Sequence, residues 1–136
     1  MYAIVTKDVQ IAARVIVDGR VVAFPTGTSY GLAANAVAGH ALQRVRNLKQ
    51  RPQEKPLSIF MAEKLWGTYL DLTSQEELFL KEHAGAALTL LVSPKEPLMH
   101  LAHEGKVGLR VIDHPLMQQL AEITHLPLTA TSANIA

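Results

Sequence analysis

Residues 106–133 read KVGLRVIDHPLMQQLAEITHLPLTATSA, and the spacing of the hydrophobic residues changes twice within this stretch. Its first seven residues form a mostly apolar run that is typical of a buried strand. The next thirteen have the spacing of an amphipathic helix, which Asp113 can cap and in which Pro115 occupies the first turn. The remaining residues return to a strand pattern that ends among small polar side chains. A strand, a helix and a strand in succession predict an α/β fold.

The same alternation runs through the rest of the chain. Further helices are predicted at 8–18, 38–50 and 74–84, and further strands at 20–24, 56–62 and 87–93. Ser74 and Glu77 have the spacing of a capping box. Residues 25–31 are rich in turn-forming residues and predict a loop. We therefore expect one α/β domain over residues 1–136, with a twisted sheet of mixed parallel and antiparallel strands flanked by helices.

The amino-acid composition argues against some classes of protein function. The chain has 136 residues, of which 13 are Lys or Arg and 12 are Asp or Glu, so its net charge is only +1. Such a balance argues against a protein that binds nucleic acid by bulk charge, and any anion site must be local. The sequence contains no cysteine and no apolar N-terminal span, which predicts a soluble protein of the cytoplasm without disulfides or membrane contact.

Several hydrophobic residues and two histidines are predicted to have structural roles and not to bind a ligand. Trp66 is expected to be a core or edge anchor. His100 and His103 have a metal-compatible spacing without a third ligand nearby, so we expect solvent-facing residues and no metal site. The following residues are predicted to belong to the core: Leu78, Phe79, Leu88, Leu90 and Leu91.

Three loop segments carry the polar residues that suit anion binding. Residues 25–32, PTGTSYGL, combine hydroxyls with glycines that let backbone N–H groups approach a ligand. Residues 49–58, KQRPQEKPLS, bring cations to the end of a predicted helix. Residues 129–134, TATSAN, add hydroxyls and an amide. Each segment alone is also what an ordinary turn or a solvated helix end contains.

Taken together, these segments resemble the YrdC-like family of threonylcarbamoyl-adenylate synthases. The resemblance rests on four stretches in the family's order: FPTGTSYGLAANA (24–36), LKQRPQEKPLSIF (48–60), VGLRVIDHPL (107–116) and PLTATSAN (127–134). It implies a nucleotide site with a catalytic tetrad of Lys49, Arg51, Ser132 and Asn134. Lys49 would supply a point charge and Arg51 a planar fork for phosphate oxygens.

The resemblance also assigns the remaining site residues. Lys55 and Thr89 are implied to contact ATP with the tetrad. The pocket for L-threonine and its carbamate is implied to comprise Thr26, Thr28, Tyr30, Arg110 and Thr131. Arg44, Arg46 and the other cations of the second predicted helix either form a solvated face or touch transfer RNA, and we expect a solvated face for those outside the tetrad.

The implied reaction joins L-threonine, bicarbonate and ATP, accompanied by Mg²⁺, into threonylcarbamoyl-adenylate for transfer RNA modification. It requires no protein nucleophile, because a carbamate oxygen attacks the α-phosphorus. Walker, dinucleotide-binding and nucleophile-elbow motifs are absent from the sequence, which agrees with this chemistry. The implied partners are the substrates, with transfer RNA or proteins that modify it.

The sequence departs from the family pattern in three places. Gly27 replaces an acidic residue, HAGAALT (83–89) lacks a proline-rich turn, and the chain ends at SANIA where the family continues. Either the chain is a compact synthase that completes its site differently, for example with a second subunit, or it is a shortened copy that folds and binds without efficient synthesis. We also expect a homo-oligomer, in which a neighbouring subunit covers apolar surface near the final strand. Two alternatives stay open: a nucleotide- or RNA-binding module with reduced catalysis, and a component that handles carbamoyl-adenylate.

Overall fold

The computed structural model describes residues 6–25, 30–50, 56–83, 88–111 and 114–132, and within them helices and strands alternate as expected. The helices are α1 (Val9–Val17), α2 (Gly39–Lys49), α3 (Trp66–Tyr69), α4 (Ser74–Glu82) and α5 (Pro115–Thr124), with 3-10 helices η1 (Glu63–Leu65) and η2 (Glu96–Leu101). The strands are β1 (Val22–Pro25), β2 (Tyr30–Ala33), β3 (Ile59–Phe60), β4 (Leu70–Asp71), β5 (Leu88–Pro94), β6 (Val107–Val111), β7 (Leu128–Thr129) and β8 (Thr131–Ser132). The predicted α/β class is confirmed.

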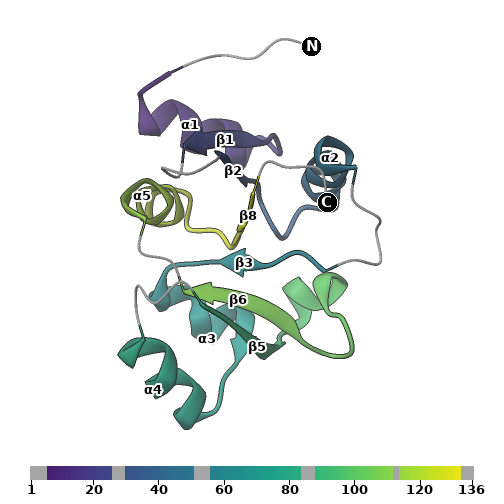
Figure 1. Cartoon of the computed structure of the whole chain (residues 1–136), viewed down its shortest axis with the longest axis vertical. Helices are drawn as coiled ribbons and strands as arrows, with labels where there is room; N and C mark the ends of the chain where they lie inside the picture. Colours follow the sequence, from purple (N-terminus) through teal and green to yellow (C-terminus); the bar gives the residue numbers. More distant parts are fainter. Residues whose placement is uncertain (1–5, 26–29, 51–55, 84–87, 112–113, 133–136) are drawn as a thin grey trace.

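The strands form a mixed, twisted arrangement in two sheets (Figure 1). One sheet has the order β1-β2-β8 and the other the order β4-β5-β6-β3-β7. Within the described part of the chain, β3 and β6 are the only parallel pair, and the other pairings are antiparallel. A parallel pair needs a long crossover, whereas the short η2 connection lets β6 return beside β5 in the antiparallel sense.

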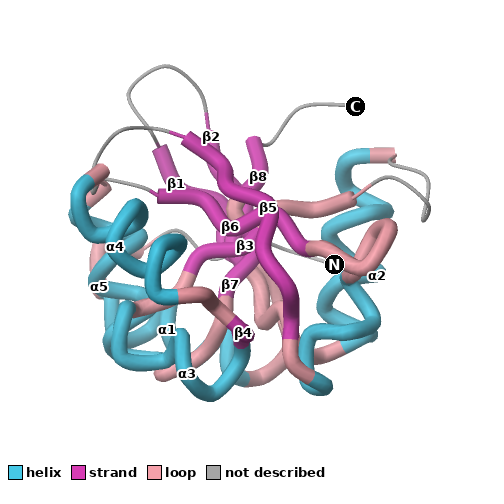
Figure 2. The backbone as a smooth tube through the Cα atoms, turned by 90° about the horizontal axis from the view of Figure 1, so that it is seen from below, coloured by secondary structure: helices cyan, strands magenta, loops and turns pink. Residues whose placement is uncertain are grey.

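Two hydrophobic cores lie on opposite sides of the larger sheet. Neighbouring side chains of a strand point to opposite faces, so Ile59 of β3 joins one core and Phe60 the other. The core around Ile59 includes the buried face of α2, and the core around Phe60 includes α1 and α5. Figure 2 accordingly shows α2 on one side of the strands and α1 and α5 on the other.

The core prediction is wrong for part of α4 and β5. Leu78, Phe79 and Leu91 are exposed, and Leu91 keeps 64% of its surface accessible. Leu88 and Leu90 are only half-buried. The apolar run at 87–93 suggested a strand buried on both faces, but β5 alternates, with its even-numbered residues turned toward the core. Trp66 is half-buried and packs against the first core, as expected.

Two further local predictions are corrected by the backbone. The loop expected at 25–31 is replaced at both ends by strand, because Pro25 pairs with Tyr30 in an antiparallel hairpin of β1 and β2. The strand expected at 126–133 is divided between β7 and β8, which belong to different sheets. The hydrophobic periodicity does not report this change of sheet, because both halves remain extended.

Helix starts also differ from the expected caps. The cap of α5 is His114, whose Nδ1 accepts from the backbone N–H of Met117, rather than Asp113. Pro115 is the first helical residue, as predicted. α1 begins at Val9 with Asp8 as its N-cap, and it is followed by Gly19 at φ +84°, where a Cβ would collide with the ring of His40. No helix in the described ranges is long and apolar enough to cross a membrane.

The capping box of α4 lies one residue earlier than predicted. Thr73 Oγ1 accepts from the Glu76 backbone N–H at 3.1 Å, and Glu76 Oε1 accepts from the Thr73 N–H at 2.9 Å. We expect Thr73→Ala to lower the free energy of unfolding by about 1 kcal/mol, because the side-chain acceptor for the Glu76 backbone N–H is lost. Urea denaturation checks this value. Ser74→Ala is the matched control, and an equal loss in both variants would contradict the assignment.

Candidate functional site

Three of the polar sequence segments meet at one place in the fold. In the sheet β1-β2-β8, Gly31 pairs with Ser132 and Leu32 with Thr131. The last turn of α2 reaches the same point, because Lys49 Nζ donates a hydrogen bond to Thr131 Oγ1 at 2.6 Å. The two residues are 82 positions apart in the chain. The structure therefore brings together the segments 25–32, 49–58 and 129–134 through their described residues.

Lys49 is a buried cation at this junction. Only 3% of its surface is exposed, and it lies in the last turn of α2, where a positive charge complements the helix dipole. Gln50 then ends the helix in the left-handed conformation at φ 54°. A buried ammonium is costly unless oxygen acceptors surround it, and Thr131 supplies one of them. Its attraction for an anion is also stronger here than in water.

The cations of α2 do not share one environment. Arg44 is exposed, as expected for a solvated face, and its guanidinium donates to the carbonyl of Gly19 at 3.3 Å. For Arg46 the expectation of a solvated face is wrong, because only 9% of its surface is exposed. The burial follows from the helix period, since Arg46 lies one turn before Lys49 on the same side. Arg51 and Lys55 lie outside the described residues.

An open face of the larger sheet carries another part of the predicted site. Thr89 of β5 pairs with Arg110 of β6, and Leu91 with Gly108. Thr89 and Leu91 are exposed, and Arg110 is half-buried. A Cβ at Gly108 would come within 3.1 Å of Thr89 Cγ2 and 3.3 Å of Ser58 Oγ. The glycine thus keeps this face clear beside Arg110.

Arg110 has an unsatisfied donor on this face. Its Nε is buried and has no hydrogen-bond partner within the described part of the chain. A buried donor without an acceptor costs about 1 to 3 kcal/mol, so such groups are rare outside functional sites. An oxyanion ligand would satisfy it.

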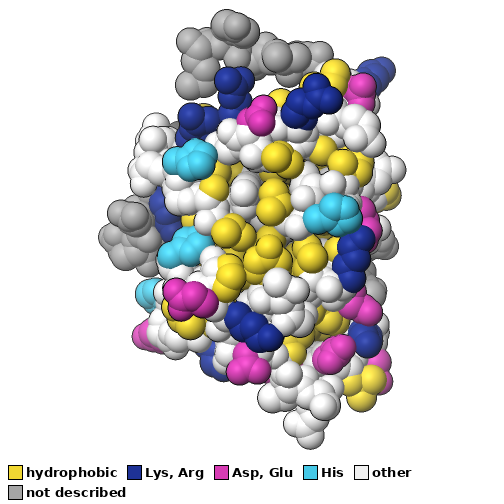
Figure 3. Space-filling view, turned by 180° about the vertical axis from the view of Figure 1, so that it is seen from behind, with side chains coloured by type: hydrophobic (Ala, Val, Ile, Leu, Met, Phe, Trp, Pro, Cys, Tyr) yellow, Lys and Arg dark blue, Asp and Glu magenta, His cyan; other side chains and the backbone are white. Residues whose placement is uncertain are grey.

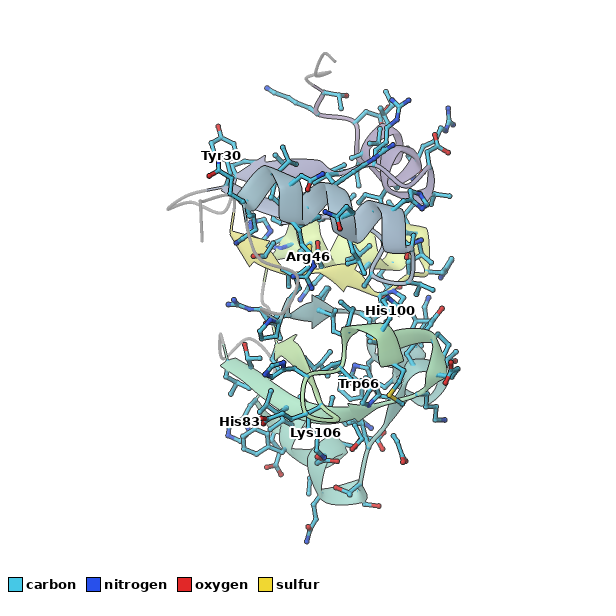
Figure 4. The ribbon with its side chains drawn as sticks, turned by 90° about the vertical axis from the view of Figure 1, so that its right-hand side faces the viewer. Tyr30, Arg46, Trp66, His83, His100 and Lys106 are labelled. Atoms are coloured by element: carbon cyan, nitrogen blue, oxygen red, sulfur yellow. The ribbon has the colours of Figure 1, made fainter. Side chains whose placement is uncertain are left out.

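Of the remaining predicted site residues, the structure describes some and leaves others outside the described ranges. Tyr30, at the start of β2, is 59% exposed and points away from the body of the protein (Figure 4). Ser132 is placed only as the backbone of β8, paired with Gly31. Thr26, Thr28 and Asn134 lie outside the described residues, as does Gly27.

The two histidines at 100 and 103 have different surroundings. The ring of His100 forms a hydrogen bond through Nε2 with the carbonyl of Ala36 at 2.9 Å, so it is anchored against another segment. Both histidines are exposed, as expected. In the portion of the chain that is described, no group of three His, Asp or Glu residues could hold a metal ion.

Comparison with known proteins identifies the family. The Sua5_yciO_yrdC family, described as "Telomere recombination", matches residues 14–136. The chain belongs to this family. The resemblance drawn from the sequence motifs is thereby confirmed, and so is the expected fold.

Curated relatives carry a consistent name. A protein of Pyrococcus abyssi named threonylcarbamoyl-AMP synthase is 35% identical over 132 residues, which cover 94% of this chain and 39% of that protein. A protein of Vibrio vulnificus with the same name is 31% identical over 136 residues, covering 96% of this chain and 73% of that protein. The chain thus spans well under half of the P. abyssi relative and about three quarters of the V. vulnificus one.

Solved structures agree with the fold. Sua5 of P. abyssi, crystallised with L-threonine, superimposes with a TM-score of 0.80 at 31% identity, covering 94% of this chain and 39% of that one. YciO of E. coli superimposes with a TM-score of 0.76 at 20% identity, which supports the fold alone. The mixed sheet with its flanking helices is therefore the shared framework of the family.

Proposed function

We propose that this chain synthesises L-threonylcarbamoyl-adenylate from L-threonine, bicarbonate and ATP, and that the product serves transfer RNA modification in the cytoplasm. The observation that carries the proposal is the buried Lys49 ammonium, hydrogen-bonded to Thr131 at the point where α2, β2 and β8 meet. The names of the relatives and the L-threonine bound to P. abyssi Sua5 support the same chemistry.

The reaction needs positioning and charge stabilisation rather than a protein nucleophile. The threonine amine and bicarbonate condense to a carbamate with loss of water. A carbamate oxygen then attacks the α-phosphorus of ATP, and the bond to the β-phosphate breaks to release pyrophosphate. Negative charge develops on the phosphate oxygens during this step, where a desolvated cation stabilises it most. Mg²⁺ would enter with ATP, held by phosphate oxygens.

We assign the nucleotide to the Lys49 end of the site. The Lys49 ammonium at this end is buried and donates to Thr131, and a desolvated cation attracts phosphate oxygens strongly. The residues proposed to contact ATP are Lys49, Arg51, Lys55, Thr89, Ser132 and Asn134. A homo-oligomer and direct contact with transfer RNA remain predictions that this assignment does not require.

We assign L-threonine to the residues around the hairpin and the open sheet face. Its carboxylate would accept from Arg110, whose Nε lacks a partner among the described residues, while Gly108 leaves room beside it. The pocket is proposed to comprise Thr26, Thr28, Tyr30, Arg110 and Thr131. The Thr131 hydroxyl can donate to a substrate oxygen while it accepts from Lys49, because a hydroxyl has both capacities.

Pyrophosphate release from ATP tests the proposal. We expect release that requires both L-threonine and bicarbonate, because the carbamate is the attacking group. Saturable ATP binding without release under any combination would contradict the synthase and favour a nucleotide-binding module. Release that requires carbamoyl phosphate instead would favour a component that handles carbamoyl-adenylate.

The Lys49–Thr131 hydrogen bond leads to a specific prediction. Thr131→Val preserves the shape of the side chain but removes the acceptor, which leaves the ammonium less well held. Hydrogen bonds to charged groups contribute about 1.5 to 3 kcal/mol, so we expect the KM for ATP to rise about tenfold or more. Steady-state pyrophosphate assays measure this change. Thr131→Ser should retain most of the affinity, and equal values for both variants would refute the role of the hydroxyl.

A further inference from the structure

The imidazole ring of His114 connects the start of α5 to the end of β1. Its Nδ1 accepts a hydrogen bond from the Met117 backbone N–H at 3.4 Å, and its Nε2 lies 3.1 Å from the carbonyl oxygen of Pro25. Pro25 and His114 are 89 positions apart in the chain. The ring thus joins two elements that are distant in sequence, and the proposed site does not include it.

The two contacts together fix which ring nitrogen of His114 carries the proton. A carbonyl oxygen can only accept, so Nε2 must donate to Pro25. A backbone N–H can only donate, so Nδ1 must be unprotonated where it meets Met117. The neutral Nε2–H tautomer is the form that satisfies both contacts. Because both nitrogens are engaged, His114 does not serve as a general acid or base.

The capping of α5 alone does not require a histidine. Asp, Asn, Ser and Thr supply the acceptor that most helix caps use, and their side chains are shorter. Pro25 has no backbone N–H, so its carbonyl is its only backbone hydrogen-bonding group. The imidazole caps the helix with its near nitrogen and reaches this carbonyl with its far one. The contact with Pro25 is therefore what distinguishes His114 from an ordinary cap residue.

The end of β1 that His114 contacts is part of the hairpin that carries Tyr30. Pro25 pairs with Tyr30, and Phe24 pairs with Gly31. The ring of His114 packs edge-on against the ring of Phe24, with the centroids 5.5 Å apart. The Phe24 ring in turn fills the space beside Gly31, because a Cβ there would lie 2.7 Å from Phe24 Cζ. The imidazole therefore supports both strands of the hairpin.

We propose that His114 is a positioning residue for L-threonine, which holds the end of the β1–β2 hairpin, and with it Tyr30, against α5. This inference rests on the proposed synthase function. His114 acts through Pro25 and Phe24 and does not touch the substrate. Without its contact, a smaller share of the molecules has the hairpin in the arrangement that binds L-threonine. Lys49 is held from α2, so the affinity for ATP should change much less.

Two amide variants separate the two contacts of the ring. The amide oxygen of His114→Asn can replace Nδ1 at the cap, but this side chain is too short to reach Pro25. The amide of His114→Gln can reach the Pro25 carbonyl, whereas glutamine is not a favoured cap residue. Steady-state pyrophosphate release gives the KM for each substrate, and urea denaturation gives the stability.

We expect His114→Asn to raise the KM for L-threonine roughly 2- to 10-fold, the range for one neutral hydrogen bond, with the KM for ATP and the urea midpoint nearly unchanged. His114→Gln should retain most of the affinity for L-threonine and lower the urea midpoint. A purely structural role predicts the opposite order, because the less stable variant would be the more impaired. A KM for L-threonine that is unchanged in His114→Asn, or raised as much in His114→Gln, would overturn the proposal.

The matched control is His125→Asn, the same substitution at the exposed C-cap of α5. Because His125 lies at the opposite end of the helix from the hairpin contact, this variant should change neither KM. An increase in the KM for L-threonine equal to that of His114→Asn would show a general effect of α5 and would overturn the assignment to His114.

Amide hydrogen exchange tests the contact without relying on activity. We expect the amides of the β1–β2 hairpin to exchange roughly 2- to 10-fold faster in His114→Asn, and those of α5 to be unchanged. Unchanged exchange in the hairpin would overturn the contact. If the hairpin responds as expected but the wild-type chain releases no pyrophosphate with L-threonine, bicarbonate and ATP, the synthase function fails instead, and the substrate role of His114 with it.

Discussion

Replacing Lys49 with alanine is expected to produce the largest loss of activity of any single substitution among the described site residues. The variant should bind ATP about 1.5 to 3 kcal/mol more weakly, which corresponds to roughly a 10- to 150-fold change, because a charged donor to the phosphates disappears. Pyrophosphate release should fall by about 100-fold or more, since removing one preorganised donor to a developing oxyanion has effects of that size. The burial of Lys49 favours a large effect, because a desolvated cation interacts strongly.

Calorimetric titration with a non-hydrolysable ATP analogue and steady-state pyrophosphate release measure these two quantities separately. Lys106→Ala is the matched control. Lys106 is exposed, and its ammonium donates a hydrogen bond to the hydroxyl of Ser93 in β5. Circular dichroism shows whether Lys49→Ala retains its fold. A folded variant with wild-type ATP affinity and turnover would remove Lys49 from the site.

The largest change in stability is expected in the sheet core. Leu109 of β6 is 2% exposed and lies between β5 and β3, so Leu109→Ala should lower the free energy of unfolding by about 2 to 5 kcal/mol. Leu91→Ala on the neighbouring strand is the matched substitution at a 64% exposed position, and we expect a change within about 0.5 kcal/mol. Urea denaturation of both variants measures the difference. Similar losses at the two positions would show that Leu91 is covered in solution.

The protein also has an apolar region on its surface. From behind, hydrophobic side chains gather across the middle of the molecule, with charged side chains around them (Figure 3). Leu78 and Leu91 are two of several large hydrophobic residues that are exposed in the described part of the chain. Single exposed apolar residues are normal in folded proteins, so periodicity rather than residue type should decide core membership.

Much of the secondary structure follows from local sequence. α1, α2 and α5 occur where the 3.6-residue spacing predicts helices, and β5 and β6 where apolar runs predict strands. Caps were less predictable. Thr73 and Ser74 are both acceptable cap residues, so the direction in which the chain enters the helix decides between them. The cap of α5 is His114, a residue type that cap preferences do not predict.

The family is indicated by the order of several motifs along the chain and not by local periodicity. No single loop distinguished an anion site from an ordinary turn, and only the ordered set of four stretches pointed to the family. That set named Lys49 and Thr131 as site residues but gave them unrelated roles. Their hydrogen bond, 82 residues apart, results from the pairing of β8 with β2 and the packing of α2 beside them.

The sequence by itself determined the α/β class, most helices and strands, and the family, because these depend on local periodicity and on residues in a fixed order. The tertiary structure alone decided which faces are buried. It exposed Leu91, buried Arg46 and divided the last predicted strand between two sheets. The physical reason is that burial depends on which segments pack against a face. A strand or helix pattern specifies that a face exists, whereas the partner that covers it comes from elsewhere in the chain.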